Sequence, residues 1–98
     1  MYVVLVEFEI ESDHFNAFKI RVLRQAKDSL ALETECHIFD VCVDTDADNH
    51  IVLYEHYSNR AAFEHHLDSD HFKDFDSEVT PWILSKSVRS LNSLGPLS

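Results

Sequence analysis

The pattern of apolar and polar residues divides the chain into short extended segments separated by amphipathic stretches. Four segments are rich in β-branched and aromatic residues, which is typical of strands, and they cover residues 2–10, 36–44, 51–57 and 82–91. The first of them alternates, so that one set of side chains shares a face: Val4, Val6, Phe8 and Ile10. Polar residues from Asp44 to His50 separate the second and third segments, which predicts a hairpin.

Apolar residues recur at helical spacing after the first predicted strand. Ser12 or Asp13 is suited to cap this helix, which is expected to end near Leu32. Its apolar face is predicted to consist of Phe15, Phe18, Val22, Ala26 and Leu30. Its wetter side is predicted to carry Lys19, Arg21, Arg24 and Lys27.

A second helical region follows the hairpin, and it is interrupted. Ser58 or Asn59 is expected to cap a helix over residues 60–67, and Ser69 or Asp70 then restarts a helix that runs to about Val79. Pro81 ends this region before the last strand. The order β-α-β-β-α-β predicts one α+β domain over residues 1–98 with a ferredoxin-like antiparallel sheet, and residues 93–98 form a loose tail.

The first and third strands carry apolar residues on both faces, as in the runs 3–6 and 51–54. An antiparallel sheet with one wet face would alternate more regularly. Helices cover one face, and a second copy of the chain is the simplest cover for the other, which predicts a homodimer.

Charge and composition restrict the partners. The net charge of −10 argues against nucleic acid and against anionic membrane surfaces. No apolar run is long enough to span a bilayer and the start lacks a basic signal-peptide region, so a cytoplasmic protein is expected. Cys36 and Cys42 lie too far apart on one predicted strand for a disulfide, and we expect buried free thiols.

Three segments resemble, in order and spacing, the antibiotic-biosynthesis monooxygenase family. They are Glu35 to Val41 (ECHIFDV), Leu53 to Tyr57 (LYEHY) and Ala61 to Phe75 (AAFEHHLDSDHFKDF). The resemblance implies a dimeric α/β barrel and is strongest to two branches. One consists of small quinol monooxygenases, which use molecular oxygen without metal or flavin. The other is an isomerase of a phosphorylated autoinducer dione, which the opening segment 4–7 and the segment 39–41 resemble most.

The sequence departs from the family pattern at two places. Glu35 stands where the family usually has a glycine. A third branch degrades haem, but the positions of its axial histidine and distal tryptophan are occupied here by Asp76 and His66. Haem is therefore not expected, and no cofactor other than oxygen is implied.

Histidines are concentrated in the broken helical region. His66 shares the apolar side with Phe63 and Leu67, which leaves His65 facing solvent, and His71 follows the break. An imidazole suits proton transfer near neutral pH, so His66 and His71 are the candidate catalytic bases. The alternative is two structural histidines satisfied by backbone or water. A metal site with Asp70 or Asp74 is not expected, because positions i and i+5 diverge on a straight helix.

The remaining candidates surround these histidines. Tyr54 is a third candidate catalytic residue, and Glu55 on the same strand is a candidate for binding substrate. The alternative for Glu55 is an ion pair with an arginine at the dimer interface. The walls of a flat apolar pocket, or simply the core, are expected to comprise Phe63, Phe72, Phe75 and Trp82.

Three functions remain open from the sequence. The leading hypothesis is a cofactor-independent monooxygenase of a small aromatic or quinol-like substrate. The second is an isomerase of a small hydroxy-dione, against which the scarcity of basic residues counts, because a phosphorylated substrate would need cations such as Arg60, Lys73 and Arg89. The third is a non-catalytic dimer that binds a small ligand.

Overall fold

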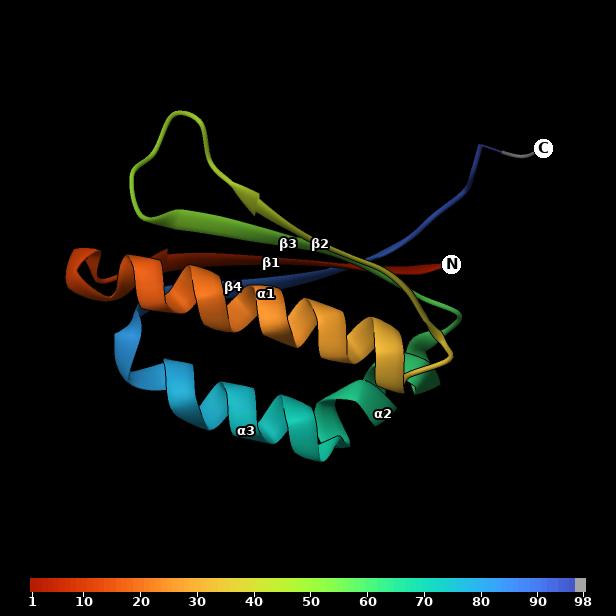
Figure 1. The fold of residues 1–98 in the computed structure, drawn as a ribbon. Coiled ribbons are helices and arrows are strands. Elements are labelled where there is room, and N and C mark those ends of the chain that lie inside the picture. Colours follow the sequence, from red (N-terminus) through yellow and green to blue (C-terminus); the bar gives the residue numbers. More distant parts are fainter. Residues whose placement is uncertain (97–98) are drawn as a thin grey trace.

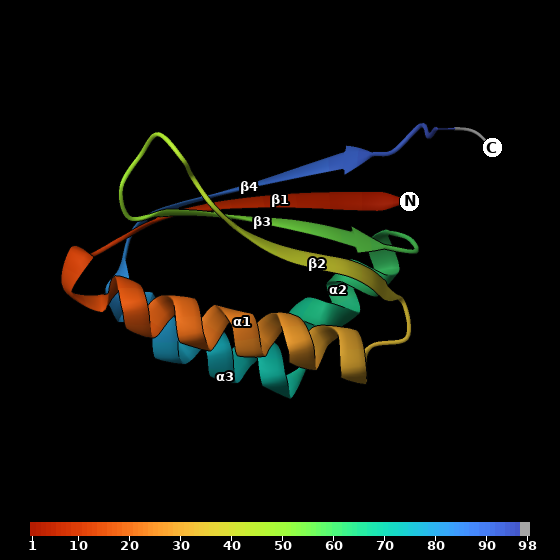
Figure 2. The same ribbon diagram turned by 45° about the horizontal axis from the view of Figure 1, so that its top comes forward.

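The computed structural model describes residues 1–96, and it has two layers (Figure 1). The chain forms, in order, β1 (Tyr2–Ile10), α1 (Phe15–Leu32), β2 (Cys36–Val43), β3 (His50–Tyr57), α2 (Arg60–Asp68), α3 (Asp70–Val79) and β4 (Ile83–Asn92). The four strands make one antiparallel sheet in the order β2-β3-β1-β4. All the helices lie against the same face of that sheet (Figure 2). The predicted α+β ferredoxin-like arrangement with a broken second helix is confirmed.

The core lies between the helices and the inner face of the sheet. The alternating set predicted on β1 faces the helices, and Val4 and Ile10 are almost completely buried. Phe8 meets Phe18 of α1 edge to face, with ring centroids 5.1 Å apart. Burial of this one stripe on each element holds the helices on the sheet, because the transfer of apolar surface out of water dominates the packing energy.

The helix α1 differs from its predicted faces at two residues. Leu30 was expected on the apolar face but is 46% exposed, and Arg21 was expected on the wet side but is only 7% exposed. The buried stripe continues through Gln25 and Ser29 instead, because this side of α1 packs against α3. Arg21 is accommodated there by an ion pair with Glu78 at 2.7 Å.

Two of the three proposed caps are confirmed. The side chain of Asn59 accepts a hydrogen bond from Ala62 N at 2.9 Å, and Ser69 caps α3 by accepting from Phe72 N. The cap proposed for α1 is wrong, because Ser12 and Asp13 lie in a 3-10 turn (Ser12–His14) that leads directly into the helix.

The strand ends also shift by one residue in places. Asp44 Oδ1 accepts from Asp46 N at 2.8 Å, and Asn49 has a left-handed φ of 61°, so β3 begins at His50 rather than residue 51. Residues Thr80–Trp82 form a 3-10 turn, and β4 therefore begins at Ile83. Cys36 is buried as predicted, but Cys42 near the end of β2 is exposed; both thiols are free.

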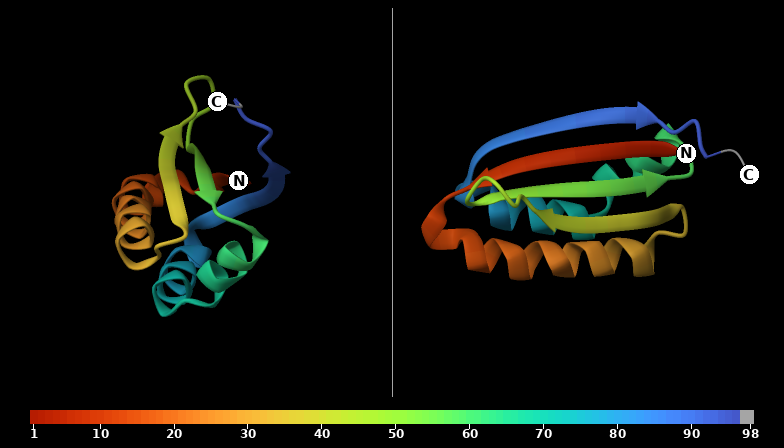
Figure 3. Two further views of the ribbon diagram at one scale, coloured as in Figure 1. Left: turned by 90° about the vertical axis from the view of Figure 1, so that its right-hand side faces the viewer. Right: turned by 90° about the horizontal axis from the view of Figure 1, so that it is seen from above.

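No helix within residues 1–96 covers the other face of the sheet, which Figure 3 shows from above. It carries apolar side chains that reach solvent: Tyr54 of β3 is 37% exposed and Leu91 of β4 is 38% exposed. Residues 93–96 continue past β4, where Ser93 N donates to Met1 O at 3.0 Å, and the rest of the predicted tail lies outside the described residues. None of the helices in the described part of the chain has the length and apolar character needed to cross a bilayer.

Candidate functional site

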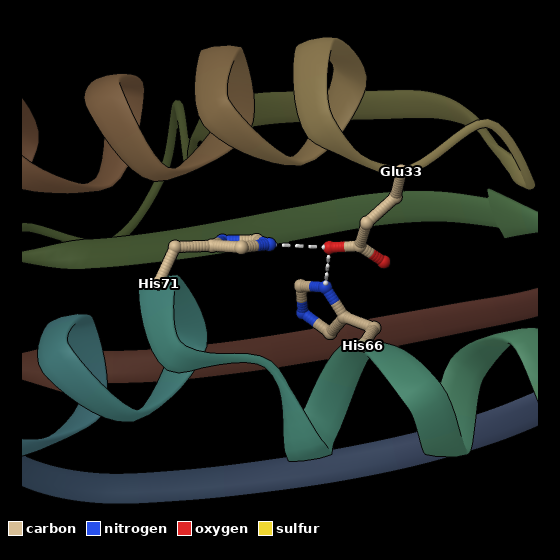
Figure 4. Close-up of side chains that lie close together, drawn as sticks. All are labelled: Glu33, His66 and His71. Carbon is tan, nitrogen blue, oxygen red and sulfur yellow. Dashed lines mark hydrogen bonds and ion pairs between the residues drawn. The ribbon is translucent and has the colours of Figure 1, made fainter.

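Two histidines and one glutamate meet between α1 and the broken helix (Figure 4). His66 Nδ1 donates a hydrogen bond to Glu33 Oε2 at 2.7 Å, and His71 Nε2 lies 2.7 Å from the same oxygen. The side chains of Glu33 and His66 are 6% and 3% exposed, and that of His71 is 15% exposed. The carboxylate therefore contacts both imidazoles where water competes little, and its hydrogen bond from His66 is stronger there than it would be at the surface.

Ser69 brings the two histidines together. It caps α3, and its hydroxyl donates to His66 O at 2.7 Å, so it ends α2 and starts α3 within one residue. The extended backbone of Ser69, with ψ of 148°, redirects the chain at this point. As a result, the rings of His66 and His71 lie 5.7 Å apart although the residues are five positions apart in sequence.

Gln25 of α1 selects the tautomer of a neutral His71. Ser29 Oγ donates to Gln25 O at 2.8 Å, so it presents a lone pair to Gln25 Nε2 at 3.4 Å. The same amide nitrogen lies 3.1 Å from His71 Nδ1 and donates to it. A neutral His71 then carries its proton on Nε2, toward Glu33, and His66 carries its proton on Nδ1, which leaves the lone pair of His66 on Nε2.

A narrow apolar cavity of about 40 Å³ lies beside the cluster. Its walls include the three aromatic residues Phe63, Phe72 and Phe75, as predicted, and four residues contribute polar side chains: Gln25, Glu55, His66 and Lys86. The space has room for a few water molecules. His66 thus joins the Glu33 cluster to an apolar chamber.

Glu55 extends this polar group along β3. Its side chain is buried and accepts a hydrogen bond from the Tyr57 hydroxyl at 2.5 Å. Burial raises the pKa of the Glu55 carboxyl above its ordinary value, and the hydrogen bond from Tyr57 only partly opposes that shift. Burial and the neighbouring Glu55 also raise the pKa of Tyr57. Both groups are therefore biased toward their neutral forms.

Cys36 lies at the edge of the same network. Burial, and to a smaller extent the charge of Glu33, raise the pKa of the Cys36 thiol to about 12. A thiol that stays protonated is a poor nucleophile. Cys36 is therefore a packing residue, as predicted.

The structure does not bring every predicted residue to the cavity. Tyr54 lies on the opposite face of the sheet from Glu55, because successive side chains of a strand point to opposite faces. Its hydroxyl is 2.6 Å from His56 Nε2 there. Trp82 stacks on His14 at the far end of the fold, with ring centroids 5.5 Å apart, because the 3-10 turn holds it there. Neither Tyr54 nor Trp82 lines the cavity within one chain, so their roles in catalysis and substrate binding stay predictions.

Two alternatives are also decided by the contacts. An ion pair of Glu55 with an interface arginine is wrong, because Glu55 faces the helices and bonds to Tyr57. Both histidines contact side chains: His66 Nδ1 bonds to Glu33, and His71 Nδ1 bonds to Gln25. Asp70 and Asp74, named as possible ligand partners, are exposed.

Glu33 and Gln25 were not predicted from the sequence, and Tyr57 was not selected among the residues of its strand. The signal for the first two was present: Gln25, Ser29 and Glu33 repeat every four residues, so they form a polar stripe beside the apolar one. A polar stripe that sits against the core side of a helix indicates a buried network. Tyr57 shares a face with Glu55 because residues two positions apart on a strand point to the same side.

Comparison with known proteins identifies the relatives of this fold. Residues 1–77 match the family model described as antibiotic biosynthesis monooxygenase. Comparison with curated proteins gives no match.

Among solved structures, a Nitrosomonas europaea protein provisionally named as such a monooxygenase is 25% identical, with a TM-score of 0.91 over 97% of this chain and 100% of that chain. A provisionally named Caulobacter crescentus relative has a TM-score of 0.92 at 18% identity, over 96% of this chain and 90% of its own. One from Bacteroides thetaiotaomicron has a TM-score of 0.89 at 18% identity, over 99% and 92% of the two chains. The last two comparisons show the shared fold alone.

Proposed function

The chain belongs to the antibiotic biosynthesis monooxygenase family, and on that basis we propose that it oxidises a small aromatic or quinol-like substrate with molecular oxygen. The protein does this without metal or flavin, because the substrate itself supplies the electrons once it is deprotonated. One oxygen atom enters the product and the other leaves as water.

The position of His66 is the observation that carries this proposal. Glu33 holds its Nδ1–H at 2.7 Å, so the basic Nε2 is available on the ring that lines the cavity. His66 takes the proton of a substrate hydroxyl, and the electron-rich anion then reacts with oxygen. The Glu33 carboxylate stabilises the imidazolium that forms, which is the usual role of a buried carboxylate behind a catalytic histidine.

The rest of the cavity supplies shape and one further polar contact. Phe63, Phe72 and Phe75 exclude water and match the flat faces of an aromatic ring. Glu55, kept neutral by burial, can donate its acid proton to a substrate oxygen while it accepts from Tyr57. Because about 40 Å³ does not hold an aromatic ring, the half-buried Phe63 and Phe72 move aside when substrate enters.

The outer face of the sheet supports a homodimer as part of this proposal. Leu5 and Leu91 lie on that face together with the partly exposed Tyr54, and β1 pairs Leu5 directly with Tyr54. Sedimentation equilibrium at several protein concentrations measures the mass directly. A dimer that Leu91→Arg dissociates supports this interface, and a monomer at all concentrations contradicts it.

Turnover of a panel of small quinols tests the oxygenase itself, with oxygen uptake and product mass followed under labelled oxygen. Uptake with one labelled atom in the product supports the proposal, provided that His66→Gln abolishes it and His65→Gln, on the exposed side of α2, does not. A product of unchanged mass formed equally well without air identifies an isomerase instead. Ligand binding without turnover identifies the non-catalytic dimer.

A further inference from the structure

We propose that Glu33, His66 and His71 also form a binding site for a divalent transition-metal ion of the zinc type. A bound ion would prevent His66 from acting as the proposed base. That effect on His66 rests on the proposed function. The binding site itself stands on the geometry of the cluster.

The three side chains offer the ligand types that zinc prefers. One ligand atom from each residue lies within 4.8 Å of the other two, and the three residues come from the end of α1, from α2 and from α3. In a tetrahedral zinc site such atoms are about 3.3 Å apart, because each lies about 2.0–2.1 Å from the metal. The two 2.7 Å contacts to Glu33 therefore need to open by a fraction of an ångström, and the two histidine nitrogens, which lie within 4.8 Å of each other, need to move closer together.

The sequence-based objection to a metal no longer holds. Positions i and i+5 diverge on one straight helix, but Ser69 separates His66 and His71 into two helices that converge on Glu33. The carboxylate that completes the set is Glu33, which follows α1, rather than the exposed Asp70 or Asp74.

Two buried polar atoms beside the cluster lack hydrogen-bond partners in the described part of the chain. His71 Nε2 is close to Glu33 but is not aligned for a hydrogen bond, and Gln25 Oε1 has no donor, although Gln25 is only 1% exposed. A metal on His71 Nε2 places the ring proton on Nδ1, and rotation of the Gln25 amide then turns Oε1 toward that proton. Both atoms become satisfied, and a histidine ligand that donates its second N–H to an oxygen is the common arrangement around metals.

Solvent approaches Glu33 from one side. A hollow of about 220 Å³ opens on the surface, and its walls are formed by Leu32, Glu33, Thr34, Glu35, Ala62 and His65. The carboxylate of Glu35 would attract a cation to this hollow, in a chain whose net charge is −10. Water in this hollow can fill the fourth coordination position.

Metal binding changes what His66 can do. The ion takes Nδ1, so a neutral ring keeps its single proton on Nε2, the nitrogen that accepts the substrate proton in the proposed reaction. The metal and the proton transfer therefore compete for one imidazole. The ion is an inhibitor of this site and is not the cofactor of the oxygenase.

Metal binding is measured on the untagged chain after treatment with a chelator. We expect one Co²⁺ per chain with the intense visible absorption of a four-coordinate site, and displacement of Co²⁺ by Zn²⁺ in calorimetry. His71→Gln should abolish the absorption, while His65→Gln, which removes an exposed neighbour, should leave it intact. Gln25→Leu keeps all three ligands and should weaken Zn²⁺ binding by about 10- to 100-fold, the usual cost of losing an outer partner.

The results separate this proposal from the oxygenase. Absence of a four-coordinate Co²⁺ spectrum would overturn the metal site, whatever the activity. A spectrum unchanged in His71→Gln would also overturn it, because the ion would then be bound by other histidines. Circular dichroism shows whether each variant is folded. If a variant that lacks a ligand does not fold, Gln25→Leu still tests the site, because it keeps all three ligands. If the metal binds but substrate turnover continues at saturating Zn²⁺, the inference that metal and proton transfer compete for His66 is wrong, and the metal site itself is still supported.

Discussion

The two faces of β3 carry the same kind of polar pair in opposite surroundings. On the inner face Tyr57 donates to Glu55 at 2.5 Å, and on the outer face the Tyr54 hydroxyl lies 2.6 Å from His56 Nε2. Both pairs join residues two positions apart on one strand. Only the inner pair is buried, lies beside the cavity and His66, and includes residues whose pKa values are raised.

The difference shows that burial, rather than hydrogen-bond length, distinguishes a candidate site from a surface contact. In a single chain, water can replace either partner of Tyr54 and His56 at little cost, whereas a buried donor or acceptor that loses its partner has no such replacement. The inner face is therefore where the chain holds groups in fixed protonation states. Substitutions matched across the two faces test this contrast.

The largest expected contrast is between His66 and His56. His66→Gln should lower kcat/KM for the best quinol by about 10²- to 10⁴-fold, the usual contribution of a general base. His56→Gln changes a histidine on the outer face and should leave kcat/KM within about twofold. Steady-state kinetics at matched oxygen concentration measures both, and equal losses would contradict a functional difference between the faces.

Glu33→Gln should have the next largest effect. The amide still hydrogen-bonds to His66, but it cannot stabilise the imidazolium, so loss of a charged hydrogen bond worth about 1.5–3 kcal/mol should lower kcat by roughly 10- to 150-fold. The matched control is Glu35→Gln, two residues away and exposed. A rise in KM with kcat unchanged would assign Glu33 to substrate binding instead.

The sequence predicted the order of elements because apolar periodicity and two caps, Asn59 and Ser69, act locally. It did not predict which face of β3 the helices cover, since alternation separates Tyr54 from Tyr57 without saying which is inside. This is why Tyr54 was chosen. Glu33 was missed for a related reason: it follows the last residue of α1, and only the packing of α1 against α3 directs it toward His66 and His71.

Removal of the two tyrosine hydroxyls compares the faces by stability. Tyr57→Phe leaves the buried Glu55 without its donor and should lower the free energy of unfolding by about 1–3 kcal/mol. On the dissociated Leu91→Arg background, Tyr54→Phe should change it by no more than about 0.5 kcal/mol, because water there replaces the lost contact with His56. Urea unfolding followed by circular dichroism measures both values on that background, and a loss for Tyr54→Phe as large as that for Tyr57→Phe would contradict the difference between the two faces.

The smallest expected effect is on the pH dependence of stability, through Glu55→Gln. Burial raises the pKa of Glu55 in the folded chain above its ordinary value of 4.5, so the folded chain binds this proton more tightly than the unfolded chain does. The stabilisation is complete below pH 4.5 and is lost as the pH rises through the raised pKa, with a slope of at most about 1.4 kcal/mol per pH unit. Glutamine stays neutral and can still accept from Tyr57. The unfolding free energy of the original chain minus that of Glu55→Gln should therefore fall with rising pH and then level off. The control is the same free-energy difference for Glu7→Gln, on the exposed face of β1. If the difference for Glu55→Gln rises with pH instead, Glu55 is held as an anion in the folded chain.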